Sequence, residues 1–302
     1  QVFGHQSPDT DSTGAPIIWS WYLKEKKGMS AVPKLLGEPN TEALFVLDHW
    51  GFEKPGIINS INKGDSVIIV DTNNPAELPE GINDADIQGI IDHHKLVGGL
   101  ETSGPIDITI RPVACTATIM FDLMGDDVSD MPDPIKGLAL SCIISDTLEF
   151  RSPTTTSRDR EVAESLAKDL KIDVSDYASK LFRAKSDVSD FSDAQLLRMD
   201  SKKYPIADLM FRVSVLETTE PDMIFRRKSS LIEAMETVCA EDSVDHVLFF
   251  VVDILREEST LFVPNKSVKK VAEKSFGVNV YDNSVLLPGV VSRKKQIIPN
   301  LK

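Results

Sequence analysis

The chain has 302 residues, of which 41% are hydrophobic and 26% charged, and it carries a formal net charge of −14. This composition is that of a globular protein, and the length suits two domains. The acidic balance opposes non-specific binding of nucleic acid, and no apolar run approaches the roughly 20 residues that a membrane helix needs. The three cysteines are widely spaced and lie among apolar residues. We therefore expect buried thiols in a cytoplasmic protein, with neither nucleic acid nor a membrane as its partner.

The first half of the chain alternates between strand-like and helix-like segments. Runs of β-branched or alternating apolar residues predict strands at residues 2–3, 34–36, 66–71, 87–92 and 106–113. Apolar residues at helical spacing predict helices at residues 17–27, just after Pro16, and at 41–50, 116–124, 135–148 and 158–170. Strands that alternate with helices form a mostly parallel sheet that is covered on both faces. The predicted fold class is therefore α/β, with a doubly wound N-terminal domain.

The second half begins after a polar, turn-rich stretch, KSDVSDFSD, at residues 185–193. Strands are predicted at residues 209–216 and 247–254, and helices at 229–238 and 268–276. These elements predict a smaller C-terminal α/β domain. We therefore divide the chain into an N-terminal domain at residues 1–186, a linker at 187–193 and a C-terminal domain at 194–302.

The stretch GHQSPDTDS, which follows the first predicted strand, holds a histidine and two aspartates within one loop, at His5, Asp9 and Asp11. Such acceptor groups repel one another and lose water when they are buried, so a cation should lie among them. A helix N-cap at Asp11 or Ser12 is the simpler interpretation. It accounts for one carboxylate and leaves His5 and Asp9 unexplained.

Two later strands also end in residues that can bind a metal ion, namely Asp71 and the triplet Asp92-His93-His94. Asp146, in SCIISDT, lies near the C-terminal end of an apolar helix, where an acid opposes the helix dipole and requires a compensating cation. A strand-terminal aspartate often forms only a turn, and a lone histidine is usually just a partly buried side chain. Because the carboxyl ends of parallel strands share one edge of the sheet, we nevertheless expect these groups to converge on a metal site.

The mixture of imidazole and carboxylate without sulfur suits manganese, cobalt, magnesium or iron better than structural zinc. The candidate ligands exceed what one ion with an open position requires. We therefore expect two ions that share a bridging carboxylate, an arrangement that can activate water for attack on phosphorus.

A basic cluster lies near the end of the sequence, in GVVSRKKQ at residues 289–296, and a second cationic candidate is MDSKKY at 199–204. A solvated basic terminus is the alternative for the first cluster. The apolar residues on both sides of it, at 290–291 and 297–298, instead place it in folded structure. Arginine offers phosphate a planar fork and lysine a point charge. Metal ions on one domain and cations on the other predict an active site for a polyanion in the interdomain cleft.

These motifs resemble those of the family II, manganese-dependent inorganic pyrophosphatases of the DHH phosphoesterase superfamily. The resemblance rests on GHQSPDTDS, Asp71, the DHH triplet at 92–94, SDT at 145–147 and the terminal SRKKQ, in the same order as in the family. It implies an enzyme that hydrolyses inorganic pyrophosphate to two phosphates with a hydroxide bridged between metal ions. The superfamily's nucleic-acid enzymes carry a GGGH-like motif instead of SRKKQ, and this sequence lacks that motif.

The resemblance also implies roles for individual residues. The metal ligands would be His5, Asp9 and Asp71 for the first ion and Asp11, Asp71, His93 and Asp146 for the second, with Asp71 as the bridge. Asp92 would orient an imidazole. The substrate-binding residues would be His94, Lys202, Arg293 and Lys294, with Lys203 as the alternative to Lys202. The residues taking part in catalysis would be Asp9, Asp71, His94, Lys202, Arg293 and Lys294.

The cofactor implied is Mn²⁺, with two ions in the resting site, Co²⁺ or Mg²⁺ as alternatives, and further Mg²⁺ or Mn²⁺ arriving with the substrate. The partners implied are inorganic pyrophosphate and a second copy of the chain, bound through the N-terminal domain near the edge strand at 106–113. Glu149 replaces a residue that is usually apolar in the family, and the sequence leaves open whether it affects metal preference or faces solvent. Two other functions stay open: an exopolyphosphatase of the same superfamily, and a metal-dependent phosphate or nucleotide sensor without catalysis.

Overall fold

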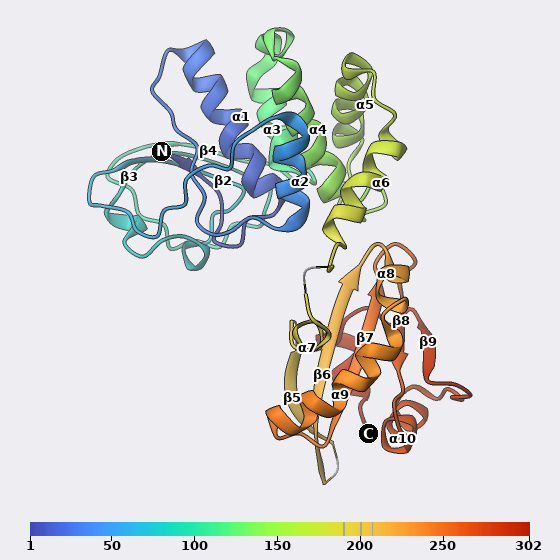
Figure 1. Ribbon diagram of the computed structural model, residues 1–302. Coiled ribbons are helices and arrows are strands. Elements are labelled where there is room, and N and C mark those ends of the chain that lie inside the picture. Colours follow the sequence, from blue (N-terminus) through green and yellow to red (C-terminus); the bar gives the residue numbers. More distant parts are fainter. Residues whose placement is uncertain (190, 200, 207) are drawn as a thin grey trace. The chain divides into compact units, whose positions relative to one another are not determined.

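In the computed structural model, which describes residues 1–189, 191–199, 201–206 and 208–302, the chain folds into two compact units. Unit 1 comprises Gln1–Lys185 and unit 2 comprises Ser186–Lys302 (Figure 1). Each unit has its own sheet and its own hydrophobic core. Both are mixed α/β structures, which confirms the predicted fold class.

Unit 1 is built on a parallel sheet with the strand order β1-β2-β3-β4. Its strands are β1 (Val2–Phe3), β2 (Ser66–Val70), β3 (Asp86–Asp92) and β4 (Asp107–Ile110). Its α-helices are α1 (Thr10–Lys27), α2 (Thr41–Trp50), α3 (Thr116–Met124), α4 (Asp133–Thr147), α5 (Ser157–Leu170) and α6 (Val174–Lys185). The helices pack on one face of the sheet, and loops with two short 3₁₀ helices, η1 (Pro75–Glu77) and η2 (Ile82–Asp84), cover the other (Figure 1). The central strands are rich in valine and isoleucine because both of their faces are buried.

The predicted start of the first helix was wrong. Helix α1 begins at Thr10 and not at residue 17, because the side chain of Asp9 accepts a hydrogen bond from Ser12 N at 2.9 Å and caps the helix. Pro16 consequently lies inside the helix, where it removes one intrahelical hydrogen bond. The strand predicted at 34–36 is reduced to isolated bridges, one of them between Leu35 and Ile57.

Two glycines allow the β1–α1 loop and the helices of unit 1 to approach closely. A Cβ atom at Gly4 would lie 1.9 Å from Ser12 Oγ, and one at Gly14 would lie 2.5 Å from Cys142 Sγ on α4. Any larger residue would push the loop off α1 or separate α1 from α4. These contacts bring the loop that contains His5 toward the end of α4 that carries Asp146.

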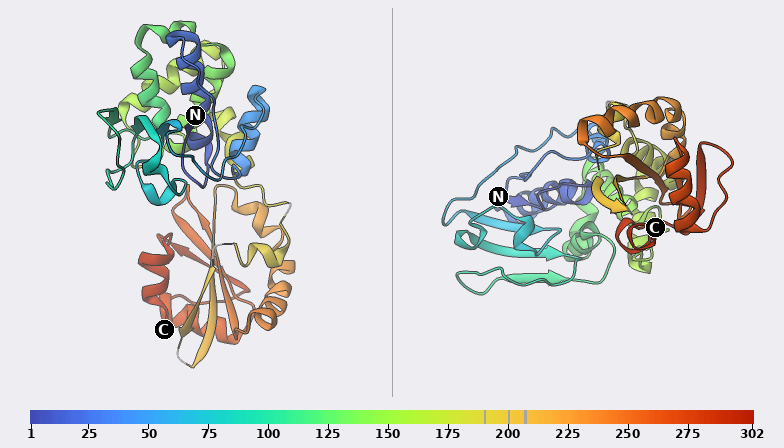
Figure 2. Two further views of the ribbon diagram at one scale, coloured as in Figure 1. Left: turned by 90° about the vertical axis from the view of Figure 1, so that its left-hand side faces the viewer. Right: turned by 90° about the horizontal axis from the view of Figure 1, so that it is seen from below.

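Unit 2 contains a mixed sheet with the order β5-β6-β7-β8-β9, in which β6 and β7 run parallel and the other neighbours antiparallel. Its strands are β5 (Ser201–Ile206), β6 (Leu209–Thr218), β7 (His246–Asp253), β8 (Glu258–Phe262) and β9 (Ser284–Pro288). Its helices are α7 (Asp193–Leu196), α8 (Pro221–Phe225), α9 (Lys228–Asp242), α10 (Lys266–Phe276), the π-helical turn η4 (Arg293–Ile297) and α11 (Ile298–Asn300). Helices α7, α8 and α9 cover one face of this sheet, and α10 with the η4 segment covers the other (Figure 2).

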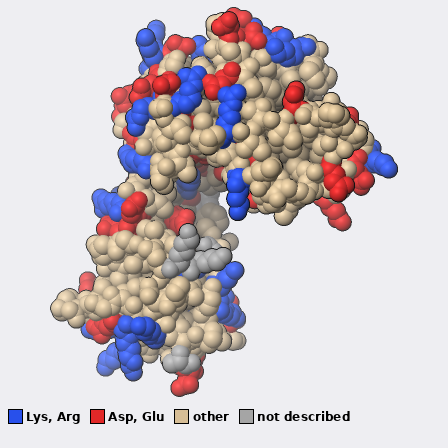
Figure 3. All heavy atoms as spheres, turned by 180° about the vertical axis from the view of Figure 1, so that it is seen from behind, with Lys and Arg blue, Asp and Glu red and all other residues tan. Residues whose placement is uncertain are grey.

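The surface carries charges of both signs. On the face shown in Figure 3, basic and acidic side chains are interspersed. Among the described residues, no helix combines the length and the apolar character that crossing a bilayer requires.

Candidate metal centre

The predicted metal ligands of unit 1 converge on one edge of its sheet. The ligand atoms of His5, Asp9 and Asp71 lie within 4.8 Å of one another. The same holds for a second group, Asp11, His93 and Asp146, and for a third that joins Asp71 and His93 to His94. The structure therefore brings together all six residues for which a ligand role was predicted, from the ends of β1, β2, β3 and α4.

Asp71 lies between the first two groups. Its Oδ2 is 3.5 Å from His5 Nε2, whereas its Oδ1 is 3.3 Å from His93 Nε2. The backbone there has a φ of 58°, a left-handed conformation that aspartate tolerates better than most residues, and Asp71 N donates a hydrogen bond to Ile91 O at 2.9 Å. The chain thus turns sharply at the end of β2, and one carboxylate faces two histidines with separate oxygens.

Two helix N-termini position the carboxylates. Asp9 is the N-cap of α1, and Asp11 lies in its first turn with 1% of its surface exposed. At the start of α3, Thr116 N donates to Asp11 Oδ2 at 2.6 Å and Thr116 Oγ1 donates to Asp71 Oδ1 at 3.1 Å. The positive ends of two helix dipoles thus point at the acidic groups and partly offset their repulsion.

Hydrogen bonds at Nδ1 orient both imidazoles of the DHH triplet. His93 Nδ1 lies 3.2 Å from Val113 O, which fixes the ring with Nε2 directed at the carboxylates. His94 Nδ1 lies 2.9 Å from Asp92 Oδ1. Asp92, which is fully buried, also accepts a hydrogen bond from Asn73 Nδ2. The imidazole that Asp92 holds is therefore that of His94, and a backbone carbonyl holds His93.

The electrostatics of this cluster require a cation. Burial, followed by the negative charges of Asp11 and Asp9, raises the pKa of both Asp71 and Asp146 well above the ordinary value of 3.8. Burial opposes the ionisation of Asp9 too, but the nearby imidazole of His5, whose Nε2 lies 3.7 Å from Asp9 Oδ2, and the hydrogen bond from Ser12 N prevail and lower its pKa. Asp11 Oδ1 and Asp146 Oδ2 are buried and accept no hydrogen bond from the described residues. Buried oxygens of this kind, next to imidazoles with a free Nε2, fit divalent metal ions.

A cavity of about 370 Å³ opens beside the cluster and is lined by His5, Gln6, Ser7, Ala76, Glu77 and His94. The side chain of His94 is 52% exposed, whereas that of His5 is 17% exposed. A small anion that entered this cavity would meet His94 first.

Glu149 does not belong to any of the three ligand groups found among the described residues. It lies in a turn after α4 in which Leu148, Glu149 and Phe150 all have a positive φ, of 48°, 54° and 68°. Its carboxylate forms an ion pair with Arg151 in the same turn. The structure thus gives Glu149 a partner other than the metal ligands.

In unit 2, the two candidate lysines of β5 have different surroundings. Both Lys202 and Lys203 are exposed, and Lys203 Nζ donates a hydrogen bond to the carbonyl oxygen of Asp242 at the end of α9. Successive residues of a strand point to opposite faces, so the two lysines cannot serve the same site.

The SRKKQ segment is part of the folded unit. Gln296 Oε1 accepts hydrogen bonds from Val291 N and Ser292 N, both at 2.9 Å, and its Nε2 donates to Gly289 O at 2.6 Å. Ile297 is fully buried in the core of unit 2. Arg293 begins the turn that these bonds close, while the side chain of Lys294 lies outside the described part of the structure.

Comparison with known proteins decides the family. The chain matches the DHH family N-terminal domain at residues 1–145 and the DHHA2 domain at 179–302. Two relatives are named as manganese-dependent inorganic pyrophosphatases. The one from Deinococcus radiodurans is 39% identical, and the match covers 100% of this chain and 97% of that protein. The one from Lactobacillus acidophilus is 36% identical, and the match covers 99% of this chain and 96% of that protein. A solved structure described as a family II inorganic pyrophosphatase of Methanococcus jannaschii has a TM-score of 0.65 and 33% identity, and the match covers 99% of this chain and 97% of that one. The chain belongs to the family II inorganic pyrophosphatases.

This family II pyrophosphatase also shares its fold, at 16% identity and a TM-score of 0.51, with an exopolyphosphatase-related protein of Bacteroides fragilis. That match covers 98% of this chain and 88% of the other. At this level of identity the likeness concerns the fold alone.

Sequence reasoning missed two groups that shape the centre of this family II pyrophosphatase, namely Thr116 and the carbonyl of Val113. Thr116 opens a predicted helix, so a free amide near the site could have been inferred from it. A backbone carbonyl leaves no trace in the residue types, and the contact of Val113 with His93 is visible only in three dimensions.

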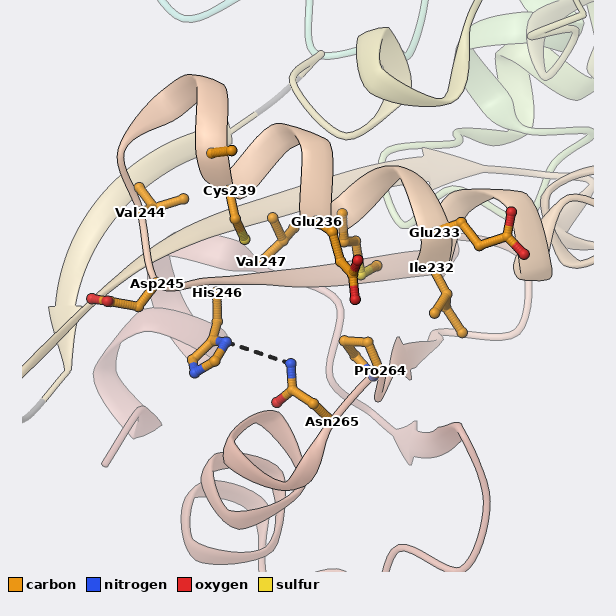
Figure 4. Close-up of a pocket in the computed structure, with 12 residues that line it drawn as sticks. Ile232, Glu233, Glu236, Cys239, Val244, Asp245, His246, Val247, Pro264 and Asn265 are labelled. Atoms are coloured by element: carbon orange, nitrogen blue, oxygen red, sulfur yellow. Dashed lines mark hydrogen bonds between the residues drawn. The ribbon is translucent and has the colours of Figure 1, made fainter.

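A second cavity of this family member, of about 690 Å³, lies between α9 and the start of β7 in unit 2 (Figure 4). Its lining includes the carboxylates of Glu233, Glu236 and Asp245, and His246 is hydrogen-bonded there to Asn265. Carboxylates repel phosphate, so this cavity does not suit an anionic substrate.

Proposed function

We propose that the protein hydrolyses inorganic pyrophosphate to two phosphates at a centre of two manganese ions in unit 1. The observation that carries the proposal is Asp71, whose two oxygens face His5 and His93 separately at 3.5 and 3.3 Å. A carboxylate placed in this way can bridge two ions. The relatives that are 36–39% identical are named as manganese-dependent inorganic pyrophosphatases, which supports both the substrate and the metal.

In this proposal the first ion is held by His5, Asp9 and Asp71, and the second by Asp11, Asp71, His93 and Asp146. When bound, the ions supply Lewis-acid chemistry and lower the pKa of water to the neutral range. The protein's own contribution is to hold the ligands in place. Thr116 donates to Asp11 and Asp71, and Val113 O holds His93, so the ligands need little rearrangement to receive the ions.

On the substrate side, we assign His94 as a hydrogen-bond donor to a phosphate oxygen, with Asp92 orienting its ring. Lys202, Arg293 and Lys294 of unit 2 would neutralise the leaving phosphate. The engagement of Lys203 with Asp242 supports the choice of Lys202. The closed turn around Gln296 supports a fixed place for Arg293 and opposes a solvated tail.

We also propose that the protein is a cytoplasmic homodimer that pairs through unit 1. Strand β4 lies at an edge of the parallel sheet, and Ile108 on it is 55% exposed. An exposed apolar edge strand is a ready surface for pairing with a second copy. All three cysteines are free thiols, which agrees with a reducing compartment.

The decisive experiment is the release of phosphate from pyrophosphate, tripolyphosphate and a dinucleotide with Mn²⁺ or Mg²⁺. We expect pyrophosphate to be hydrolysed far faster than the other two. Comparable rates on tripolyphosphate would instead identify an exopolyphosphatase. Metal binding without any phosphate release would indicate a sensor, although the presence of all six predicted ligands opposes that outcome.

A further inference from the structure

One buried carboxylate of unit 1 has no place in the proposed reaction. Glu42, near the start of α2, is fully buried and belongs to none of the ligand groups found in the described residues. Its Oε1 accepts hydrogen bonds from Thr10 Oγ1, at 2.5 Å, and from Ser145 Oγ. A buried charge is expensive to keep, and well-packed apolar residues often replace such groups without loss of stability. The position of Glu42 therefore calls for a reason other than core packing.

The two hydroxyl groups that Glu42 accepts from lie next to metal ligands in the sequence. Thr10 stands between Asp9 and Asp11, and Ser145 immediately precedes Asp146. Glu42 Oε1 therefore links the start of α1, which carries the proposed ligands Asp9 and Asp11, with the end of α4, which carries Asp146. Cys142 Sγ of α4 also donates a weak hydrogen bond to Thr10 O, at 3.4 Å.

The second oxygen of Glu42 faces a cation. Lys185 Nζ lies 3.7 Å from Glu42 Oε2, which accepts no hydrogen bond from the described residues. Lys185 is the last residue of α6 and of unit 1. The side chain of Lys185 is 36% exposed, so its ammonium group offsets the buried charge and keeps contact with water.

We propose that Glu42 is a positioning residue of the metal centre, which holds the Asp9–Asp11 turn and Asp146 at the separation that the ions require, with Lys185 as its counter-ion. The inference rests on the proposed function, since it presupposes that the ligand groups bind manganese. Without Glu42 the two segments would still fold, because apolar packing between α1 and α4 remains. Their ligands would then have to be brought together by the ions themselves, and affinity would fall.

The test is calorimetric titration of the metal-free chain with Mn²⁺, comparing the wild type with Glu42→Ala, which removes the accepting oxygen. Glu38→Ala is the matched control, because Glu38 is an exposed residue just before α2 that pairs with Lys54 at 2.7 Å. We expect the dissociation constant for Mn²⁺ to rise about 10- to 100-fold in Glu42→Ala, as is typical when a partner of a ligand is removed, and to stay unchanged in Glu38→Ala. The spin coupling between manganese ions in the EPR spectrum should weaken in parallel.

Ser145→Ala provides a second, milder variant that removes the link to α4 and leaves the charge in place. It should also weaken Mn²⁺ binding, and its effect should not add to that of Glu42→Ala, because both break the same contact. A purely structural role predicts the opposite pattern: a lower melting temperature in EDTA with an unchanged Mn²⁺ affinity. That pattern overturns the inference, and if Glu42→Ala fails to fold, an unchanged affinity in Ser145→Ala overturns it alone. A wild-type protein that does not bind Mn²⁺ would overturn the proposed function instead.

Discussion

Asp71 and Asp92 are both buried aspartates beside the DHH histidines, yet they touch different groups. Asp71 faces His5 and His93, whereas Asp92 contacts the ring and the backbone amide of His94. We therefore expect Asp71→Asn to reduce kcat/KM for pyrophosphate more than Asp92→Asn, whose loss should be about 10- to 100-fold. Steady-state kinetics and manganese titration of both variants check this. Two tight manganese sites in Asp71→Asn would contradict the bridging role.

Arg293 is the residue on which the proposed substrate role of unit 2 can be tested most directly. Arg293→Ala should leave the resting manganese content intact and weaken the binding of substrate or transition state by roughly 1.5–3 kcal/mol, the contribution of a charge-assisted contact. Arg293→Lys should recover only part of this loss, because an ammonium group cannot reproduce the two-pronged fork. Steady-state kinetics and metal analysis of both variants measure these effects.

Arg256 provides the matched control for Arg293. It is an arginine of the same unit whose side chain is 74% exposed and which pairs with Asp253 at 3.6 Å. Arg256→Ala should leave kcat and KM unchanged. If Arg293→Ala changes kcat and KM no more than Arg256→Ala does, the SRKKQ segment is not part of the active site.

At the scale of elements, helices α2 and α3 occur at residues 41–50 and 116–124, as predicted. Helix α6 and strands β5, β8 and β9 were not predicted. Strands β5 and β9 are sheet edges, where exposure weakens the apolar alternation, and each contains a proline, which edges tolerate. Strand β8 is short, and its first three residues are polar. The start of α1 was missed because Pro16 was taken as a boundary, although the cap at Asp9 lies further upstream.

The same contrast holds for the candidate site. The convergence of His5, Asp71 and the DHH triplet follows from the rule that parallel strands share one carboxyl edge, so it could be predicted. The distribution of the Asp71 oxygens between two histidines could not, because it depends on a left-handed φ of 58° at a residue that is not glycine. The role of Glu42 was equally invisible, since an acid in the first turn of a helix is common.

Strand β4 allows a test of the proposed homodimer. Ile108→Lys places a charge on the exposed edge, and lysine at an edge opposes pairing of strands between chains. We expect this variant to be a monomer where the wild type is a dimer, as measured by analytical ultracentrifugation. Leu44→Lys, on the surface of α2 and also in unit 1, is the control and should stay dimeric, since Leu44 is 42% exposed but lies away from the sheet edge. A wild type that is monomeric at micromolar concentration would contradict the proposal.

For the molecule as a whole, the acidic cluster should make stability depend on both pH and metal. Without metal, the raised pKa of Asp71 means that the folded state holds a proton that the unfolded chain has lost above its ordinary pKa of 3.8. This group's contribution to the free energy of unfolding therefore falls as the pH rises through the window from 3.8 to the raised value. Manganese requires the ionised form, so its affinity should rise with pH over the same window.

Thermal melts in EDTA across this pH window isolate the effect when wild type and Asp71→Asn are compared. The melting temperature of Asp71→Asn minus that of the wild type should increase as the pH rises, because the amide cannot ionise. If this difference in melting temperature does not change with pH, burial and charge repulsion do not raise the pKa of Asp71.

The ligands of the centre are far apart along the chain, and this has a consequence for how the protein matures. His5, Asp9 and Asp11 all follow β1, a strand of only two residues, while Asp146 lies at the end of α4. A chain emerging from the ribosome cannot complete the proposed second metal position until α4 has been made and has docked on α1. Ions that bind this centre bind the folded chain and not the unfolded one, so they add to the stability of a unit whose core already packs without them. Metal loss is therefore expected to lower the melting temperature of unit 1 and to leave its fold in place.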